Sequence, residues 1–300
     1  MKKKTYLFTL MAMALTLGSC SDNENGIGGE TSKYITVSTS IGNMTRVATD
    51  EKGGQTFEEG DEISVYAWTG DATVAPETSE RVVNNAINKL TNGTWVSTPQ
   101  MLWKNNREKH YFIGVYPTAA ISDLSAGEYT FDANKQTESD LLVAVNPDGL
   151  SYNVDEPQTV PLTFTHVMAK LAVNLTYKNQ WGGIPTVEKV VVGNAAKEAT
   201  INYLTKVVTP STTAKEDFSL PEITENTKYV SVIIPQEEVT QLTIVIGGKN
   251  FVYDNGTPFK LESGKITTVN LEVGRDEIKL GDVKITNWED GSTFSGEALN

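Results

Sequence analysis

Short segments in which polar and apolar residues alternate follow one another along most of the chain, and Gly, Asn or Pro separates them. Alternation places every second side chain on the same face of an extended strand. Short strands with turn residues between them are typical of antiparallel β-sandwiches and not of alternating strands and helices. The sequence therefore predicts an all-β fold with strands in these segments: 34–41, 63–68, 109–117, 140–149, 189–194, 228–235, 242–248, 250–256, 266–273 and 278–285.

One segment, residues 79–90, is ambiguous. Its sequence SERVVNNAINKL spaces Val82, Ala86 and Leu90 four residues apart, which is also compatible with a short helix. Asn92-Gly93 follows directly, and this dipeptide is the strongest short signal for a two-residue hairpin turn. We therefore favour a β-hairpin that turns at Asn92-Gly93.

In residues 160–177 (VPLTFTHVMAKLAVNLTY), the alternation of apolar and polar residues shifts by one position in the middle of the segment. Leu162 and Phe164 share one face of a strand, whereas the apolar residues from Val167 onward occupy odd positions. A β-bulge produces such a one-residue shift. We predict one long, half-buried strand with a kink at His166, and a structural role for this histidine rather than a role as ligand or base.

The N-terminal 19 residues read as a secretory signal. Three lysines precede the apolar run YLFTLMAMALTL, and small residues follow it. The run is shorter than the roughly 20 apolar residues that a transmembrane helix needs. Residues 17–20 (LGSC) resemble the lipobox of bacterial lipoproteins, in which the cysteine is acylated and becomes the new N-terminus. The sequence predicts lipid attachment at Cys20, the single cysteine in 300 residues.

After Cys20 the chain is polar, rich in glycine and acidic, as in a flexible tether. Without the signal segment, 22 basic residues remain against 38 acidic residues, for a net charge near −16. Nucleic-acid binding through phosphate contacts requires a basic face, so this composition excludes it. We also expect the protein to contact anionic membranes only through its lipid.

The sequence contains few motifs that indicate catalysis, phosphate binding or metal binding. It lacks a P-loop, G-x-G-x-x-G, H-E-x-x-H and a cysteine pair with metal-ligand spacing. Residues 57–62 (FEEGDE) carry four carboxylates, for which a calcium site is the alternative to an acidic turn. A glycosidase's two carboxylates can lie far apart in a sequence, but we expect no enzyme here. We expect core or strand-edge positions, rather than a sugar platform, for the five tryptophans: Trp68, Trp95, Trp103, Trp181 and Trp288.

A series of landmarks, in order along the chain, resembles the fimbrillin family of Bacteroidales, whose members are lipoprotein-derived pilus subunits. Each landmark is short, but together they span nearly the whole mature chain. They are LGSC at 17–20, ITVSTSIGNMTRVA at 35–48, FEEGDEISVYAW at 57–68, YFIGVYP at 111–117, DLLVA at 140–144, VPLTFTHVMAKLAVNL at 160–175, VSVIIPQ at 230–236, LESGKITTVNLEV at 261–273 and ITNWEDG at 285–291.

The resemblance implies two tandem transthyretin-like antiparallel β-sandwiches, a place outside the cell and no cofactor. We expect a pro-segment at 20–46, which holds the tether and a removable first strand, and then sandwiches at 47–156 and 157–300. The later alternative for the junction is NQWGG at 179–183.

Proteolytic processing is expected between Arg46 and Val47. The alternative is that Arg46 is a solvated loop residue, or that the chain is an anchor subunit that keeps its first strand and its lipid. Arg46 is an isolated basic residue after a strand and before a turn-rich stretch, which suits a trypsin-like protease. In the family that the chain resembles, a cut after such an arginine releases the subunit from its lipid and removes the first strand. Loss of residues 34–41 would open an apolar groove and an unpaired sheet edge.

A candidate donor strand lies at residues 276–288. Ile278 and Leu280 share one phase and Val283 and Ile285 the other, which predicts two short strands joined at a bulge or turn. Donated to a neighbouring subunit, such a strand would supply main-chain hydrogen bonds and apolar anchors. A plain edge strand of the second sandwich is the alternative.

The expected function is a structural or adhesive subunit of fimbriae at the outer membrane surface, and its partners are other fimbrial subunits and a host adhesion target. The alternative is a surface lipoprotein that does not polymerise and binds a host glycan or protein.

Overall fold

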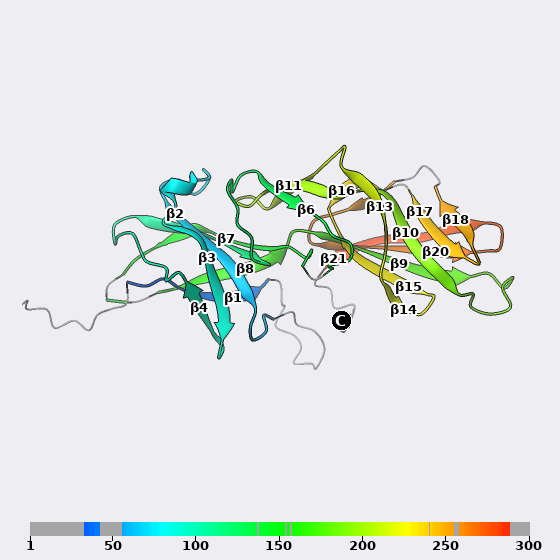
Figure 1. The fold of residues 1–300 in the computed structure, drawn as a ribbon, viewed down its shortest axis with the longest axis horizontal. Coiled ribbons are helices and arrows are strands. Elements are labelled where there is room, and N and C mark those ends of the chain that lie inside the picture. The colour runs from blue at the N-terminus through cyan, green and yellow to red at the C-terminus, as the bar shows by residue number, and fades with distance from the viewer. Residues whose placement is uncertain are drawn as a thin grey trace, which may run out of the picture.

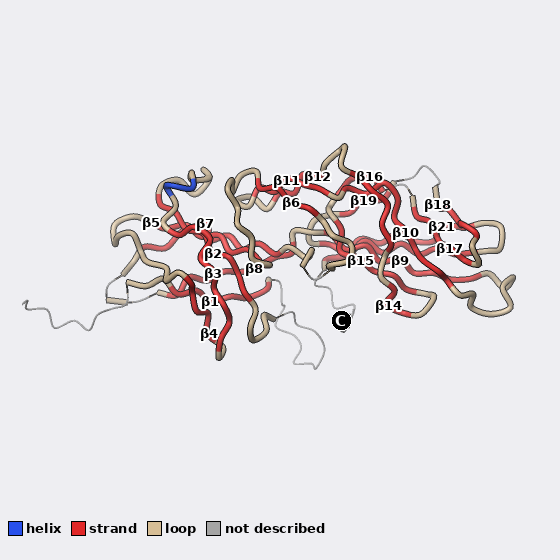
Figure 2. Tube along the Cα trace, in the orientation of Figure 1, coloured by secondary structure: helices blue, strands red, loops and turns tan. Residues whose placement is uncertain are grey.

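The structure is a computed structural model, and it describes residues 33–42 and 56–288 apart from 137, 154, 157, 240 and 255–257. Cys20, Arg46 and Val47 lie outside these residues. The described part is all-β: it has 21 strands and a single turn of 3-10 helix, η1 (Thr78–Glu80), with no α-helix. The strands form two lobes that lie end to end along the long axis of the molecule (Figures 1 and 2).

The first lobe is built on one seven-stranded sheet. Its pairs are antiparallel except at one edge, where β1 runs parallel to β8. In spatial order its strands are β1 (Thr36–Ile41), β8 (Thr159–His166), β7 (Leu142–Ser151), β5 (Lys109–Tyr116), β2 (Glu62–Thr69), β3 (Val83–Thr91) and β4 (Thr94–Thr98).

The two edges of this sheet curl toward each other and meet. Ile35 donates its main-chain N–H to the oxygen of Met101 at 3.0 Å, and Trp103 donates to the oxygen of Lys33 at 3.1 Å. The residues just before β1 thus pair with the residues that follow β4. The curled sheet encloses its own apolar cluster, formed by Ile35, Val37, Ile63, Val65, Ala67, Val83, Ala86, Trp95, Met101, Trp103, Phe112, Leu142, Ala144, Val160, Leu162 and Phe164.

The second lobe is a sandwich of two main sheets, completed by a short two-stranded one. Its pairs are antiparallel except for β9 with β20. The four-stranded sheet contains β13 (Lys215–Ser219), β10 (Val187–Ala196), β17 (Leu242–Ile246) and β18 (Lys249–Tyr253). The five-stranded sheet contains β14 (Glu222–Thr224), β15 (Lys228–Ile233), β9 (Ala169–Tyr177), β20 (Lys265–Val273) and β21 (Ile278–Asn287), and the short sheet pairs β16 (Gln236–Val239) with β19 (Phe259–Leu261).

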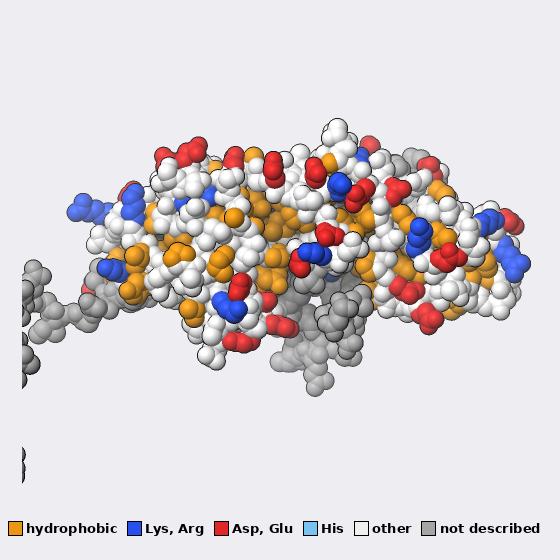
Figure 3. All heavy atoms as spheres, viewed as in Figure 1, with side chains coloured by type: hydrophobic (Ala, Val, Ile, Leu, Met, Phe, Trp, Pro, Cys, Tyr) orange, Lys and Arg blue, Asp and Glu red, His pale blue; other side chains and the backbone are white. Residues whose placement is uncertain are grey.

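A further three-stranded sheet joins the lobes. Its strand β6 (Gly127–Thr130) leaves the first lobe between β5 and β7 and pairs with β11 (Glu198–Asn202), which pairs in turn with β12 (Val207–Pro210). One apolar cluster runs from Tyr66 and Trp68 of the first lobe through the second. Apolar side chains also cross the junction on the face in Figure 3, where acidic side chains are spread over both lobes. The lobes are therefore packed together and not strung on a linker.

The hairpin predicted at Asn92-Gly93 is confirmed. β3 and β4 pair antiparallel with Thr91 opposite Thr94, and the two turn residues have φ of 51° and 72°. Two consecutive positive φ values define the type I′ turn, which Asn-Gly adopts at little cost. The helical alternative for 79–90 is wrong, because the tertiary sheet determines the structure from Val83 onward.

The prediction of one long strand over 160–177 is wrong. The segment forms two strands, and β8 belongs to the seven-stranded sheet whereas β9 belongs to the five-stranded sheet of the second lobe. The phase shift at His166 marks the passage between sheets at Val167-Met168. Both sheets need apolar side chains, so the apolar pattern continues across the passage.

The same crossover places the lobe junction later than residue 156. Since β8 pairs with β1 and β7 of the first lobe, the chain changes sheets at Val167-Met168, after Asp155-Glu156 and before 179–183. His166, at the end of β8, has a structural setting, because its Nδ1 lies 2.8 Å from Asp140 Oδ1 and its side chain is buried.

Candidate functional site

The two strands to which the sequence assigns a role, β1 and β21, each lie at the edge of a sheet. An edge strand is hydrogen-bonded along one side only and is the natural place for exchange with another chain. The candidate site therefore comprises β1 with the apolar surface beneath it, and β21 with its neighbour β20.

β1 is held along its length by β8. Its six residues pair in parallel register from Thr36 with Thr159 to Ile41 with Phe164. Beyond the strand, Gly42 donates its N–H to the oxygen of Phe164 at 2.7 Å. Each such bond contributes about 1 kcal/mol net, so the ladder provides a substantial part of the attachment.

The inward side chains of β1 and of the residue before it provide the apolar part of the attachment. Ile35 is 1% and Val37 6% exposed, and burial of such side chains contributes about 1.5–3 kcal/mol each. We call the surface that they cover the β1 seat, formed by Trp95, Met101, Trp103, Val160, Leu162 and Phe164. On the outer face, Thr36 and Thr159 hydrogen-bond through their hydroxyls at 3.2 Å, as do Ser40 and Thr163.

One polar contact crosses the enclosed core. Trp95 donates its indole Nε1–H to Thr39 Oγ1 at 3.0 Å. Because Trp95 belongs to β4, the contact links the two edges of the curled sheet. Loss of β1 would remove this acceptor from the indole N–H.

An aromatic group closes the seat near the end of β1. The ring of Phe57 lies 5.1 Å from Phe164, 5.3 Å from Trp95 and 5.4 Å from Tyr116, each in edge-to-face geometry. Burial, helped by nearby Asp61, raises the pKa of Tyr116 to about 12. Phe57 is a part of the site that the sequence analysis did not identify, and its place as the first aromatic residue after the turn-rich stretch 49–56 is the available signal.

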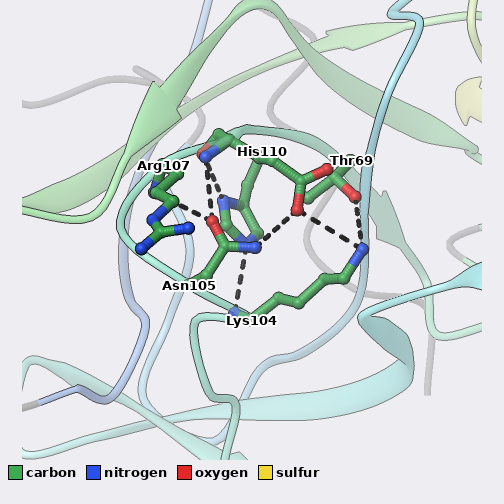
Figure 4. A network of polar contacts seen from close by, with 6 residues as sticks. Thr69, Lys104, Asn105, Arg107 and His110 are labelled. Carbon is green, nitrogen blue, oxygen red and sulfur yellow. Dashed lines mark hydrogen bonds and ion pairs between the residues drawn. The ribbon is translucent and has the colours of Figure 1, made fainter.

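The opposite end of the seat is shaped by a polar turn between β4 and β5 (Figure 4). Lys104 donates its main-chain N–H to His110 Nε2 at 3.1 Å, and His110 Nδ1 faces the oxygen of Glu108 at 3.2 Å. His110 is therefore neutral with its proton on Nδ1, and burial lowers its pKa. The whole group consists of Thr69, Lys104, Asn105, Arg107, Glu108 and His110. It fixes the segment that pairs with Lys33 and Ile35 ahead of β1.

At the C-terminal end, β21 is one strand of ten residues, rather than the two short strands predicted. The predicted irregularity is present, because the register with β20 shifts between Val283 and Leu280. The bulge keeps the apolar residues on one face despite their change of phase. Ile278 and Leu280 are half-buried against the core, whereas Val283 is 39% and Ile285 37% exposed.

The acidic segment 57–62 serves the local fold. Glu59 accepts the main-chain N–H groups of the Asn92-Gly93 turn, and Glu62 pairs with Lys89 at 2.9 Å. No group of three or more His, Cys, Asp or Glu suited to a metal ion exists among the described residues.

The tryptophans lie in cores, as predicted. Trp68, Trp95, Trp103 and Trp288 are buried, and Trp181 is half-buried. No helix in the described ranges is long and apolar enough to cross a membrane.

A family model described as fimbrillin-like matches residues 45–288. The chain is similar to the crystal structure of a candidate cell adhesion protein from Bacteroides uniformis, with TM-score 0.63, 18% identity, and coverage of 86% of this chain and 100% of that one. A candidate cell adhesion protein from Bacteroides ovatus gives TM-score 0.61, 17% identity and coverage of 85% and 98%. A fimbrial protein from Bacteroides vulgatus gives TM-score 0.52, 12% identity and coverage of 86% and 100%. At these identities the likeness concerns the fold. No curated protein sequence matches the chain.

Proposed function

Because the chain belongs to the fimbrillin-like family, we propose that it is a structural or adhesive subunit of cell-surface fimbriae and has no catalytic activity. The family match covers both lobes, and the solved structures similar to it include one called a fimbrial protein. The protein is exported through its signal segment and is anchored in the outer membrane by lipid on Cys20 before assembly.

The observation that carries the proposal is the attachment of β1. It is an edge strand, joined to the rest of the first lobe by one parallel ladder, by the burial of Ile35 and Val37, and by a few hydrogen bonds to the segment 95–103. Its removal would expose the β1 seat and the free edge of β8. A strand from a second subunit could then restore the same bonds, which favours polymerisation by strand exchange.

Processing between Arg46 and Val47 would convert β1 from a covalent to a non-covalent part of the subunit. Gly42 and Phe57, the described residues that carry contacts on either side of the cut, both contact Phe164. Cleavage in the stretch between them would therefore leave the seat intact. We propose this cut as the event that allows β1 to leave.

β21 is the proposed donor. Its side chains Ile278, Leu280, Val283 and Ile285 lie on one face and are incompletely buried, so their transfer to the β1 seat of a neighbour would bury additional apolar area. Other fimbrial subunits are thus the direct partners, and a host surface is the partner of the assembled fibre.

Electrophoresis of surface material, with and without boiling, tests polymerisation, and N-terminal mass spectrometry of the same material tests processing. We expect a ladder that collapses on boiling and a mature N-terminus at Val47. Polymers whose subunits begin at Cys20 would rule out the processing step, and a monomer without boiling would rule out assembly.

A second candidate function has one observation in its favour. A surface cleft of about 780 Å³ lies beside the polar turn of Figure 4, and its walls include Trp68, Arg81, Leu102 and Lys104. Such a mixed wall would suit a host glycan or peptide bound by a lipoprotein that does not polymerise. Retention of an immobilised glycan or host protein by a purely monomeric surface form would favour this alternative.

A further inference from the structure

The C-terminal strand makes few apolar contacts of its own. Seven of its ten residues are exposed, the other three are half-buried, and none is fully buried. Within the described part of the chain, its ladder with β20 is its only strand pairing. The strand is therefore held mainly by its main-chain ladder with β20 and only in small part by apolar burial.

Trp288, the residue that follows the strand, is buried, unlike the residues of the strand itself. Trp288 is 7% exposed, and its ring stacks on the imidazole of His166 with centroids 4.1 Å apart and planes at 9°. Lys170 Nζ lies 4.2 Å from the centroid of the indole. Trp288 also donates its main-chain N–H to the oxygen of Gly264 at 3.1 Å.

The site that receives this indole is built by the lobe crossover. His166 ends β8 and is oriented by Asp140, whereas Lys170 lies near the start of β9. The turn before β20 is fixed to the same crossover, because Gly264 donates its N–H to the oxygen of Met168 at 2.8 Å. Gly264 has φ of 67°, and a Cβ there would lie 3.0 Å from the oxygen of His166. The end of β21 is therefore docked on the crossover between the two lobes.

The indole N–H does not take part in this docking. The Nε1–H of Trp288 is buried and has no hydrogen-bond partner among the described residues. A buried donor without an acceptor loses its hydration without compensation. Within the described part of the chain, the indole thus supplies stacking and apolar contact without a hydrogen bond from its Nε1–H.

We propose that Trp288 is a latch: its indole, stacked on His166 and Lys170, keeps β21 stored on β20, and its withdrawal is the step that frees the strand. This inference rests on the proposed donation of β21. It adds a named residue that controls when the donor strand becomes available. Opening begins at the crossover, where Trp288 lies, and then passes along the ladder toward Ile278.

Hydrogen exchange of the purified full-length protein tests the latch without any need for polymerisation. In the wild type, we expect the amide of Trp288 and the amides of β21 to exchange through one common opening, which is more frequent than the opening of β9. Exchange of the Trp288 amide far ahead of the amides of β21 would overturn the proposal.

Two substitutions form a matched pair. Trp288→Phe keeps a flat ring for stacking and removes the unpartnered donor, whereas Trp288→Leu keeps apolar bulk without a ring. We expect opening of β21 to become about tenfold more frequent in Trp288→Leu and to stay within about threefold of wild type in Trp288→Phe, with β9 unchanged in both. Equal protection of β21 in the two variants would refute the latch.

Protection of β9 reports whether each variant is folded. If Trp288→Leu unfolds, the wild-type exchange pattern and Trp288→Phe decide the question. The ladder assay separates the two proposals: a wild type that forms no ladder contradicts strand donation, whereas common opening of Trp288 and β21 still supports the latch.

Discussion

Phe57 packs edge-to-face on Phe164, with ring centroids 5.1 Å apart and planes at 75°. Phe164 also accepts the main-chain N–H of Gly42 at 2.7 Å. The chain therefore contacts the same residue of β8, Phe164, where it leaves β1 and again where it returns toward β2. The residues between these contacts can be cut without loss of either one, and the first prediction follows from this.

Arg46→Ala should prevent processing. A trypsin-like protease needs a cationic side chain before the cut, so the variant should remain full-length, lipidated and monomeric. Lys52→Ala, in the same stretch, is the control and should be processed like the wild type. The measurement is the mass of the surface protein together with electrophoresis without boiling. A processed Arg46→Ala subunit would place the cut elsewhere.

Cys20→Ala should abolish anchoring. Stable attachment to a membrane requires more than one acyl chain, and the lipoprotein pathway supplies several chains at one cysteine. We expect the variant to lack lipid and to be absent from the outer surface in protease-accessibility and surface-labelling assays. Ser21→Ala should behave like wild type. Normal display of Cys20→Ala would contradict the lipoprotein route.

Ile35→Ala and Val37→Ala should loosen β1. Each substitution removes buried methyl groups from the seat, at a cost of about 1–4 kcal/mol in the free energy of unfolding. Ser38→Ala, on the exposed face of the same strand, should cost less than about 0.5 kcal/mol. Urea unfolding measures the difference, and hydrogen exchange of β1 localises it. Similar costs at positions 37 and 38 would argue against the apolar attachment of β1.

Val283→Ser combined with Ile285→Ser should impair polymerisation more than folding. Both side chains are more than a third exposed in the subunit, so their loss should change the unfolding free energy by less than about 1 kcal/mol. In a neighbour's seat they would be buried, and the ladder should weaken or vanish. Deletion of 276–300 should give a folded monomer. Ladders from the truncated protein would exclude donation from this end.

Low pH should destabilise the polar turn between β4 and β5, which contains His110. Burial lowers the pKa of His110 in the folded state below its ordinary value of about 6.5. Its contribution to stability is therefore fully present above pH about 6.5 and is lost as the pH falls through the folded-state pKa. Urea midpoints at pH 8 and pH 5 should differ more in wild type than in His110→Gln, whose amide oxygen can accept the Lys104 N–H at both values. Equal differences would show that His110 does not control this transition.

Local chemistry made parts of the fold predictable. Asn92-Gly93 sets a hairpin because its two residues accept positive φ, and the alternation of polar and apolar residues in β1 indicates which of its faces is buried. The bulge in β21 was visible as a change of phase between Leu280 and Val283. Each of these features is determined by residues adjacent in sequence.

The remaining features depend on contacts between distant segments. Nothing local to Lys33 and Ile35 indicates that they pair with Met101 and Trp103. A change of phase at His166 fits a bulge within one sheet as well as a passage between two, and only the partners of β8 and β9 distinguish these cases. For the same reason the sequence predicts a core or strand-edge position for Trp288, but not its stacking on His166.

The parallel pairing of β1 with β8 also determines at which end of the molecule a tether from Cys20 would join. Thr36 lies beside Thr159, at the end of β8 remote from the second lobe, and Ile41 lies beside Phe164 near the crossover. A tether from Cys20 would thus join the first lobe at its end remote from the second lobe, and the stretch with Arg46 starts about 20 Å away, near the crossover. In a precursor anchored in this way, the first lobe would be the one attached to the lipid. A cut at Arg46 would then be made at the opposite end of β1 from the lipid.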